Sequence, residues 1–267
     1  MSSKTCSGSQ HWLAAGVAGS GVGIIGGMIG LGGAEFRLPL LIGTFGFLAL
    51  QAVILNKALS LLVVATALPA RLMAVPLADL TPHWTIVVNL LAGSLLGAYL
   101  GATWATRMSA RTLYRVLALL LVLISVTLLT TQLGHLQPAD LTGPVQAIAG
   151  VFAGAAIGVV AALMGVAGGE LLIPTIVLLY GVDIKIAGSL SLTVSLPTML
   201  VAFARYSKDK SFSVLAANRT FVLAMATGSI VGTILGAALL GVVPSAVLVP
   251  LLAILLLLSA RKVWRHG

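Results

Sequence analysis

The stretch Gly30–Pro39 reads Gly-Leu-Gly-Gly-Ala-Glu-Phe-Arg-Leu-Pro, and the stretch Gly165–Pro174 reads Gly-Val-Ala-Gly-Gly-Glu-Leu-Leu-Ile-Pro. They are copies of one motif, 135 positions apart and identical at four of ten positions. The copies contain the only two glutamates of the chain, Glu35 and Glu170. A carboxylate within an apolar segment is expensive to place in a membrane, so its repetition marks a candidate functional site.

The composition is typical of a membrane protein. The chain of 267 residues is 59% hydrophobic and 8% charged, with a mean hydropathy of +1.14. Stretches such as Trp84–Ala105 and Leu113–Thr131 are long enough to cross a hydrocarbon core of roughly 30 Å. They lack the polar–apolar alternation of barrel strands, so we expect an all-α polytopic membrane protein. The net charge of +9 is explained by membrane orientation rather than by nucleic acid binding, because no soluble basic domain carries it.

The two motif copies belong to a longer internal repeat. At the same spacing of 135, Ser60-Leu61 matches Ser195-Leu196, and the glycine stripe Gly93–Gly101 matches Gly228–Gly236. A collinear series of this kind predicts a duplicated unit. The glycine stripes themselves are typical of helix packing faces.

We expect two repeats, residues 1–134 and 145–267, within one integral membrane domain. A polar linker at 135–144 joins them. The second segment of each repeat is short, and it either spans the membrane or re-enters it. The ten expected apolar segments are 12–29, 36–50, 51–75, 84–106 and 112–132, then 146–164, 171–184, 186–206, 219–240 and 245–261.

The basic residues predict the orientation of these segments. They cluster at both chain ends and at two connections, as Lys4; Arg107, Arg111 and Arg115; Arg205, Lys208, Lys210 and Arg219; and Arg261, Lys262 and Arg265. All of these clusters are cytoplasmic if both termini are inside and each half crosses the membrane an odd number of times. Two homologous halves with odd crossings are inserted upside down relative to each other, which makes them inverted repeats.

The glycine-rich backbone before each glutamate predicts an anion site. Glycines permit unwound backbone at membrane depth, and a helix that begins near Ala34 points its free N–H groups and positive dipole end into the gap. Two such helix N-termini facing each other near the midplane can bind an anion. Arg37 adds a positive charge in the first half only, where the second half has Leu172. The anion contacts that we expect here come from Gly32, Gly33, Ala34, Arg37, Gly168 and Gly169.

The two glutamates have two interpretations that the sequence leaves open. Each carboxylate can stabilise the exposed amides of the first helical turn. Alternatively, Glu35 or Glu170 carries a proton that couples transport to the proton gradient.

A second polar cluster follows in the third segment of each half. Lys57, next to Asn56, can extend to the interface, face a cavity as a cation for an anionic substrate, or pair with one of the glutamates. In the second half, the hydroxyls of Ser191, Thr193 and Ser195 can coordinate an oxyanion, although such hydroxyls more often bond within their own helix. We include all five residues among the expected substrate contacts.

Several functional classes are excluded. The single cysteine, Cys6, rules out an internal disulfide and a cysteine-based metal site. No histidine pair has metal-ligand spacing, no nucleophile–base set is apparent, and no nucleotide-binding motif is present. We therefore expect no catalysis, no cofactor and no bound metal.

These motifs resemble those of the TauE/SafE family, the sulfite exporter or 4-toluene sulfonate uptake permease family. The resemblance rests on both glycine-rich motifs that end in Glu-x-x-x-Pro, on Asn56-Lys57, and on Ala187–Leu190. It implies a secondary transporter of the cell inner membrane that moves small anions, often sulfite or organosulfonates, by alternating access. An anion channel of the same architecture is the alternative. The expected partners are a small anionic substrate and the lipid bilayer; protons as the coupling ion and a homo-oligomer are left open, and no nucleic acid partner is expected.

Overall fold

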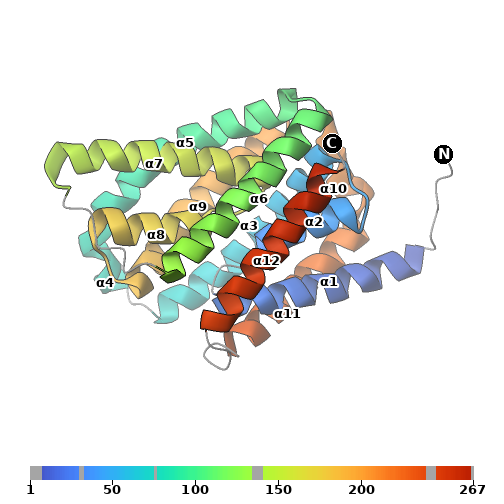
Figure 1. The fold of residues 1–267 in the computed structure, drawn as a ribbon, viewed down its shortest axis with the longest axis horizontal. Coiled ribbons are helices and arrows are strands. Elements are labelled where there is room, and N and C mark those ends of the chain that lie inside the picture. Colours follow the sequence, from blue (N-terminus) through green and yellow to red (C-terminus); the bar gives the residue numbers. More distant parts are fainter. Residues whose placement is uncertain (1–7, 30–32, 75–76, 134–140, 239–244, 266–267) are drawn as a thin grey trace.

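The described chain is helical throughout (Figure 1). A computed structural model of the protein describes residues 8–29, 33–74, 77–133, 141–238 and 245–265. Its helices are α1 (Gly8–Ile29), α2 (Ala34–Gly43), α3 (Ala49–Ala74), α4 (Leu77–Leu80), η1 (Thr81–His83), α5 (Trp84–Arg107), α6 (Ala110–Leu133), α7 (Gly143–Met164), α8 (Gly169–Tyr180), α9 (Ile184–Tyr206), η2 (Lys210–Phe212), α10 (Ser213–Ala217), α11 (Arg219–Ala238) and α12 (Ser245–Trp264). All ten expected segments are found as helices. The short helices α4, η1, η2 and α10 lie in connections where the apolar pattern gave no signal.

The protein is a multi-pass membrane protein. Among the described residues, six helical windows are long and apolar enough to cross a membrane, namely Ala49–Thr66, Thr81–Arg107, Ala110–Thr127, Gly143–Met164, Lys185–Tyr206 and Arg219–Gly236. Large apolar side chains remain exposed on the outer helices, for example Leu96 of α5 and Leu223 of α11, each more than 60% exposed. Lipid contact explains this exposure, because water would make it unfavourable.

Each half begins with a long helix followed by a shorter one that runs back beside it. The Gln146 amide near the start of α7 donates to the carbonyl of Leu179, near the end of α8, at 2.7 Å. In the first half, Trp12 of α1 and Phe45, just after α2, line one cavity. The second helix of each half is shorter than predicted. Helix α2 ends at Gly43 where we expected residue 50, and α8 ends at Tyr180 where we expected residue 184.

Two helix pairs that join the halves make equivalent contacts. Helix α1 packs along α11, and α5 packs along α7. Glycines bring each pair so close that an added Cβ would collide with a backbone carbonyl of the other helix, which confirms that the glycine stripes are packing faces. Each contact in one helix pair has an equivalent contact in the other pair. Adding 135 to the number of the first-half residue and subtracting 135 from that of the second-half residue gives the equivalent two residues. The equivalent pairs are Gly19–Met225 with Gly154–Leu90, Gly23–Ser229 with Gly158–Ser94, Gly93–Val151 with Gly228–Gly16, Gly97–Ala155 with Gly232–Ser20, and Gly101–Val159 with Gly236–Ile24.

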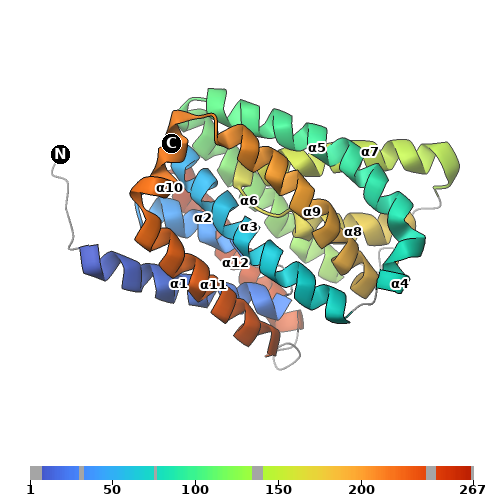
Figure 2. The ribbon, with the colours of Figure 1, turned by 180° about the vertical axis from the view of Figure 1, so that it is seen from behind.

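The start of α1 and the end of α12 lie at the same end of the molecule in both views (Figures 1 and 2). Basic side chains connect neighbouring helices there. The guanidinium carbon of Arg115 lies 5.7 Å from the centre of the Trp264 ring, and Arg205 Nε donates to the hydroxyl of Thr103 at 2.9 Å. Basic residues of both predicted connections, Arg115 and Arg205, therefore make contacts at this end, and Lys4 lies outside the described residues.

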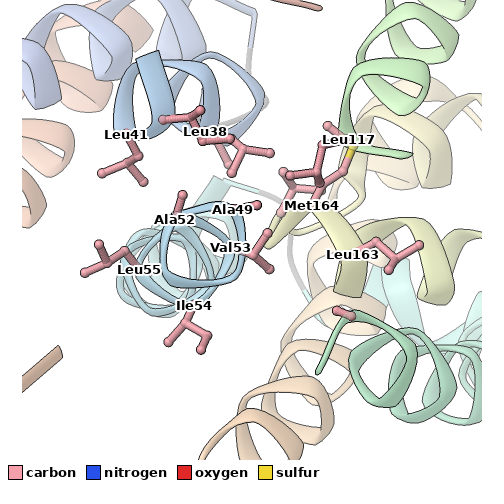
Figure 3. Close-up of a cluster of buried hydrophobic side chains, with 14 of the residues drawn as sticks. Leu38, Leu41, Ala49, Ala52, Val53, Ile54, Leu55, Leu117, Leu163 and Met164 are labelled. Atoms are coloured by element: carbon pink, nitrogen blue, oxygen red, sulfur yellow. The ribbon is translucent and has the colours of Figure 1, made fainter. Parts of the chain in front are cut away.

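A buried apolar cluster holds α2 and the end of α7 against α3 (Figure 3). Leu38 and Leu41 of α2 lie toward Ala52 of α3, and Met164, the last residue of α7, lies beside Leu117 of α6. All five side chains are fully buried. This packing fixes the positions of the two broken helices, where the repeated motif lies.

Candidate functional site

Both copies of the motif form the same backbone structure. Gly33 precedes α2 with φ 70° and Gly168 precedes α8 with φ 85°, a left-handed conformation that favours glycine. The carbonyls of these two glycines accept the first hydrogen bonds of the short helices. The prediction that a helix begins near Ala34 is confirmed. Gly32 lies outside the described residues.

The two glutamates meet at the helix starts. Glu35 and Glu170 are both buried, at 2% and 5% exposure, in the first turns of α2 and α8. Each carboxyl group lies close to its own backbone N–H and close enough to the other carboxyl group to interact with it. No described residue comes near enough to give either Glu170 oxygen a well-formed hydrogen bond. The sequence singled out these two residues as candidates, but it did not predict that the two side chains face each other.

Arg37 places a buried positive charge beside this pair. Its side chain is fully buried on α2, and the Glu35 carboxylate is near enough to interact with its charge. The equivalent residue of α8, Leu172, is also buried. The site is therefore symmetric in its carboxylates and asymmetric in its cation.

Asn56 of α3 connects the two breaks. Its Nδ2 donates to the carbonyl of Ala34, at the start of α2, and to the carbonyl of Met164, at the end of α7, both at 3.0 Å. Gly165 packs directly on the α3 backbone at this point, since an added Cβ would contact Val53 and Asn56. Position 56 thus joins the motif of the first half to that of the second.

Lys57 is turned toward the end of α7. Its fully buried Nζ donates to the carbonyls of Ala161 at 2.8 Å and Val166 at 2.7 Å. Of the orientations that the sequence left open, neither extension to the interface nor pairing with a glutamate is the one observed. Tyr206, which the sequence did not single out, donates its hydroxyl to Ala162 at the same helix end at 2.9 Å.

The hydroxyls of α9 differ in their contacts. Ser191 and Thr193 donate to carbonyls of their own helix, at Gly188 and Ser189. Ser195 is buried, and its Oγ has no partner among the described residues. Ser60 of α3 has the same property and lies 135 positions earlier. Ser60 was absent from the predicted contacts, although its match to Ser195 in the repeat was the signal that could have identified it.

Two cavities lie at opposite ends of the molecule. One, of about 490 Å³, lies at the starts of α5, α7 and α9 and the end of α8; the other, of about 430 Å³, lies at the starts of α1 and α11 and just after α2. In Figure 1, helices α4 and α10, which are next in the sequence to residues of the first and second lining respectively, lie at opposite ends of the ribbon. Their linings correspond by the repeat, for example Tyr180 to Phe45 and His83 to Asn218. The first also contains Asp183 and the second Arg219.

The starts of α2 and α8 combine helix N-termini, a buried arginine and a carboxylate pair, which are groups that can bind an oxyanion and exchange a proton. Within the described ranges, no three histidine, cysteine, aspartate or glutamate side chains gather in a way that could hold a metal ion.

Comparison with known proteins gives the family. The model of the family described as Sulfite exporter TauE/SafE matches residues 17–263, which include both motif copies and every described residue of the site. No curated protein and no solved structure matches the chain. Members of this family are membrane transporters and not enzymes. The match covers well over half of the sequence, and the chain therefore belongs to the TauE/SafE sulfite exporter family of membrane transporters.

Proposed function

We propose that the protein moves small sulfur-containing anions, such as sulfite or organosulfonates, across the cell inner membrane by alternating access. Membership of a sulfite exporter family supports this class of substrate. The observation that carries the proposal is that the starts of α2 and α8, one from each half, meet at the Glu35–Glu170 pair. The two corresponding cavities at opposite ends are suited to be the two entrances to this point.

We propose further that residues 1–134 and 145–267 are inverted repeats with both termini in the cytoplasm and with α2 and α8 re-entrant. The exchange-symmetric contacts of α1 with α11 and of α5 with α7 support the repeat. The gathering of basic side chains at the end where α12 finishes supports the orientation, since cytoplasmic connections are enriched in lysine and arginine.

The anion binds between the two helix starts. The N–H groups of α2 and α8 supply partial positive charge, and Arg37 supplies a full charge with bidentate donors. The hydroxyls of Ser60 and Ser195 are buried, unpartnered within the described chain and related by the repeat, which makes them suitable additional donors. Lys57 contributes positive charge nearby while its Nζ is bonded to the end of α7.

The glutamates couple this binding to protons by competition. An ionised carboxylate near its own backbone N–H occupies the positive helix end that the anion needs. Protonation removes its negative charge and frees the helix end for the substrate. Anion and proton therefore bind together, and transport takes the form of symport.

Flux into proteoliposomes tests the proposal. Uptake of radiolabelled sulfite, sulfoacetate and taurine is measured with and without a pH gradient, with chloride as the control anion. We expect saturable uptake of at least one sulfur anion and accumulation above equilibrium when protons flow in the same direction. Flux that does not saturate and follows only the anion's own gradient would instead indicate a channel.

A further inference from the structure

The end of α7 holds an ammonium group in a setting of carbonyl oxygens. Lys57 Nζ donates to Ala161 and Val166 at 2.8 and 2.7 Å, and the lysine has no exposed surface. Within the described parts of the chain, no carboxylate interacts with this ammonium group. The partners of this buried charge are therefore backbone oxygens.

Such a place favours a cation for physical reasons. The last carbonyls of a helix lack intrahelical donors and form the negative end of its dipole. Helix α7 ends at Met164, and Gly165 turns the chain out of the helix with φ 71°. In membrane proteins, unwound carbonyls and the C-terminal ends of broken helices are suited to coordinate monovalent cations. The Oδ1 of Asn56 is a further buried acceptor without a described partner, on the residue whose Nδ2 bonds Met164.

We propose that the break after α7 is a monovalent cation site and that its resident cation is the ammonium group of Lys57. This inference rests on the geometry of the break alone and goes beyond the proposed function, so it stands or falls independently of the transported anion. In the second half, Leu192 occupies the position equivalent to Lys57. The tethered cation therefore belongs to one break only.

If the site binds a cation, the stability of wild type and of Lys57→Ala responds differently to added cations. In the wild type the site holds the ammonium group of Lys57, which is tethered to the chain by its side chain. Sodium or potassium therefore does not stabilise the wild-type protein through this site. In Lys57→Ala the carbonyls lose their cation, and a free small cation can replace it. A ligand that binds only the folded state raises its stability in proportion to the logarithm of its concentration above Kd.

The experiment measures thermal unfolding of the purified full-length protein at constant ionic strength with sodium, potassium, methylammonium or choline. For Lys57→Ala we expect a rise in Tm that is logarithmic in the concentration of sodium or methylammonium, of about 3–6 °C at ten times Kd, and none with choline. Wild type should respond equally to all four cations. The matched control is Tyr206→Phe, which removes one hydrogen bond from the same helix end without removing a charge.

A second measurement tests the proposal even if Lys57→Ala folds poorly. Membranes that contain Lys57→Ala are solubilised in each cation, and the monodisperse peak is quantified by gel filtration. At least a threefold higher recovery in sodium or methylammonium than in choline supports the cation site. The proposal is overturned if recovery is equal in all four cations, or if no protein is recovered in any of them, and no cation-specific Tm shift is seen. A cation-specific shift in Tyr206→Phe of the same size as in Lys57→Ala also overturns it.

Discussion

The break after α7 and the start of α2 share a backbone design but differ in the side chains that surround them. Lys57, Asn56 and Tyr206 all donate to carbonyls at the end of α7. At the positions equivalent to Lys57 and Asn56, the second half has Leu192 and Ser191, and Ser191 bonds within its own helix. The two breaks therefore share their glycines and glutamates but differ in the charges and hydrogen bonds around them.

This difference suggests different tasks for the two hairpins. The α7–α8 hairpin is anchored to α3 by three buried hydrogen bonds, two of which come from the charged ammonium group of Lys57. The α2 helix carries Arg37, and its Ala34 carbonyl accepts a hydrogen bond from Asn56 of α3. We expect the anchored hairpin to act as the frame and the first hairpin to supply most of the affinity for the anion.

The largest expected effect separates the two glutamates. Arg37 offsets the charge of Glu35, whereas among the described residues no cation acts on Glu170. We therefore predict that Glu170 carries the coupled proton. With one proton per anion, a pH difference of one unit supports about tenfold accumulation in proteoliposomes. Glu170→Gln should abolish this accumulation, and Glu35→Gln should retain it. Equal behaviour of the two variants would show that the carboxylates act as a symmetric pair.

The second prediction concerns a substitution that makes the first half resemble the second. Arg37→Leu copies Leu172, and it removes a charged donor whose hydrogen bonds are worth about 1.5–3 kcal/mol. We expect the Kd for the transported anion to rise at least about tenfold, measured from the anion-induced shift in Tm. Leu172→Met, a change of similar volume at the equivalent position, is the control and should bind normally. Unchanged affinity in Arg37→Leu would remove the proposed cationic contact.

The third prediction tests what the two halves share. An added Cβ at Gly19 would collide with the carbonyl of Met225, and one at Gly154 would collide with that of Leu90. We expect Gly19→Ala and Gly154→Ala to destabilise the protein similarly, by about 3 kcal/mol or roughly 6–12 °C in Tm. Gly21→Ala on the same helix as Gly19 meets open space, so it should be neutral or slightly stabilising. A large difference in Tm between the first two variants would mean that the equivalent contacts contribute unequally to stability.

The sequence predicted the features that depend on local pattern. Apolar length located the helices, glycine spacing located the packing faces, and the spacing of 135 linked Glu35 to Glu170. What it left open depends on tertiary contacts. A lysine in an apolar helix can reach the interface, an acid or a carbonyl, and only the position of α7 beside α3 selects the carbonyls for Lys57. Tyr206 was missed for the same reason, because its partner lies 44 positions away in the chain.

The smallest expected effect concerns the residue that joins the two breaks. Asn56→Ser copies Ser191 and removes the bonds to Ala34 and Met164, since a serine side chain is too short to reach both carbonyls. Loss of two net hydrogen bonds of about 0.5–1.5 kcal/mol each should lower Tm by roughly 2–12 °C. The control is Ser125→Ala, which removes one buried bond between α6 and α12, far from either motif in the sequence. If Asn56 only stabilises the fold, both variants will transport normally at low temperature. If it couples the breaks, Asn56→Ser alone will show a reduced maximal rate with little change in the affinity for the anion.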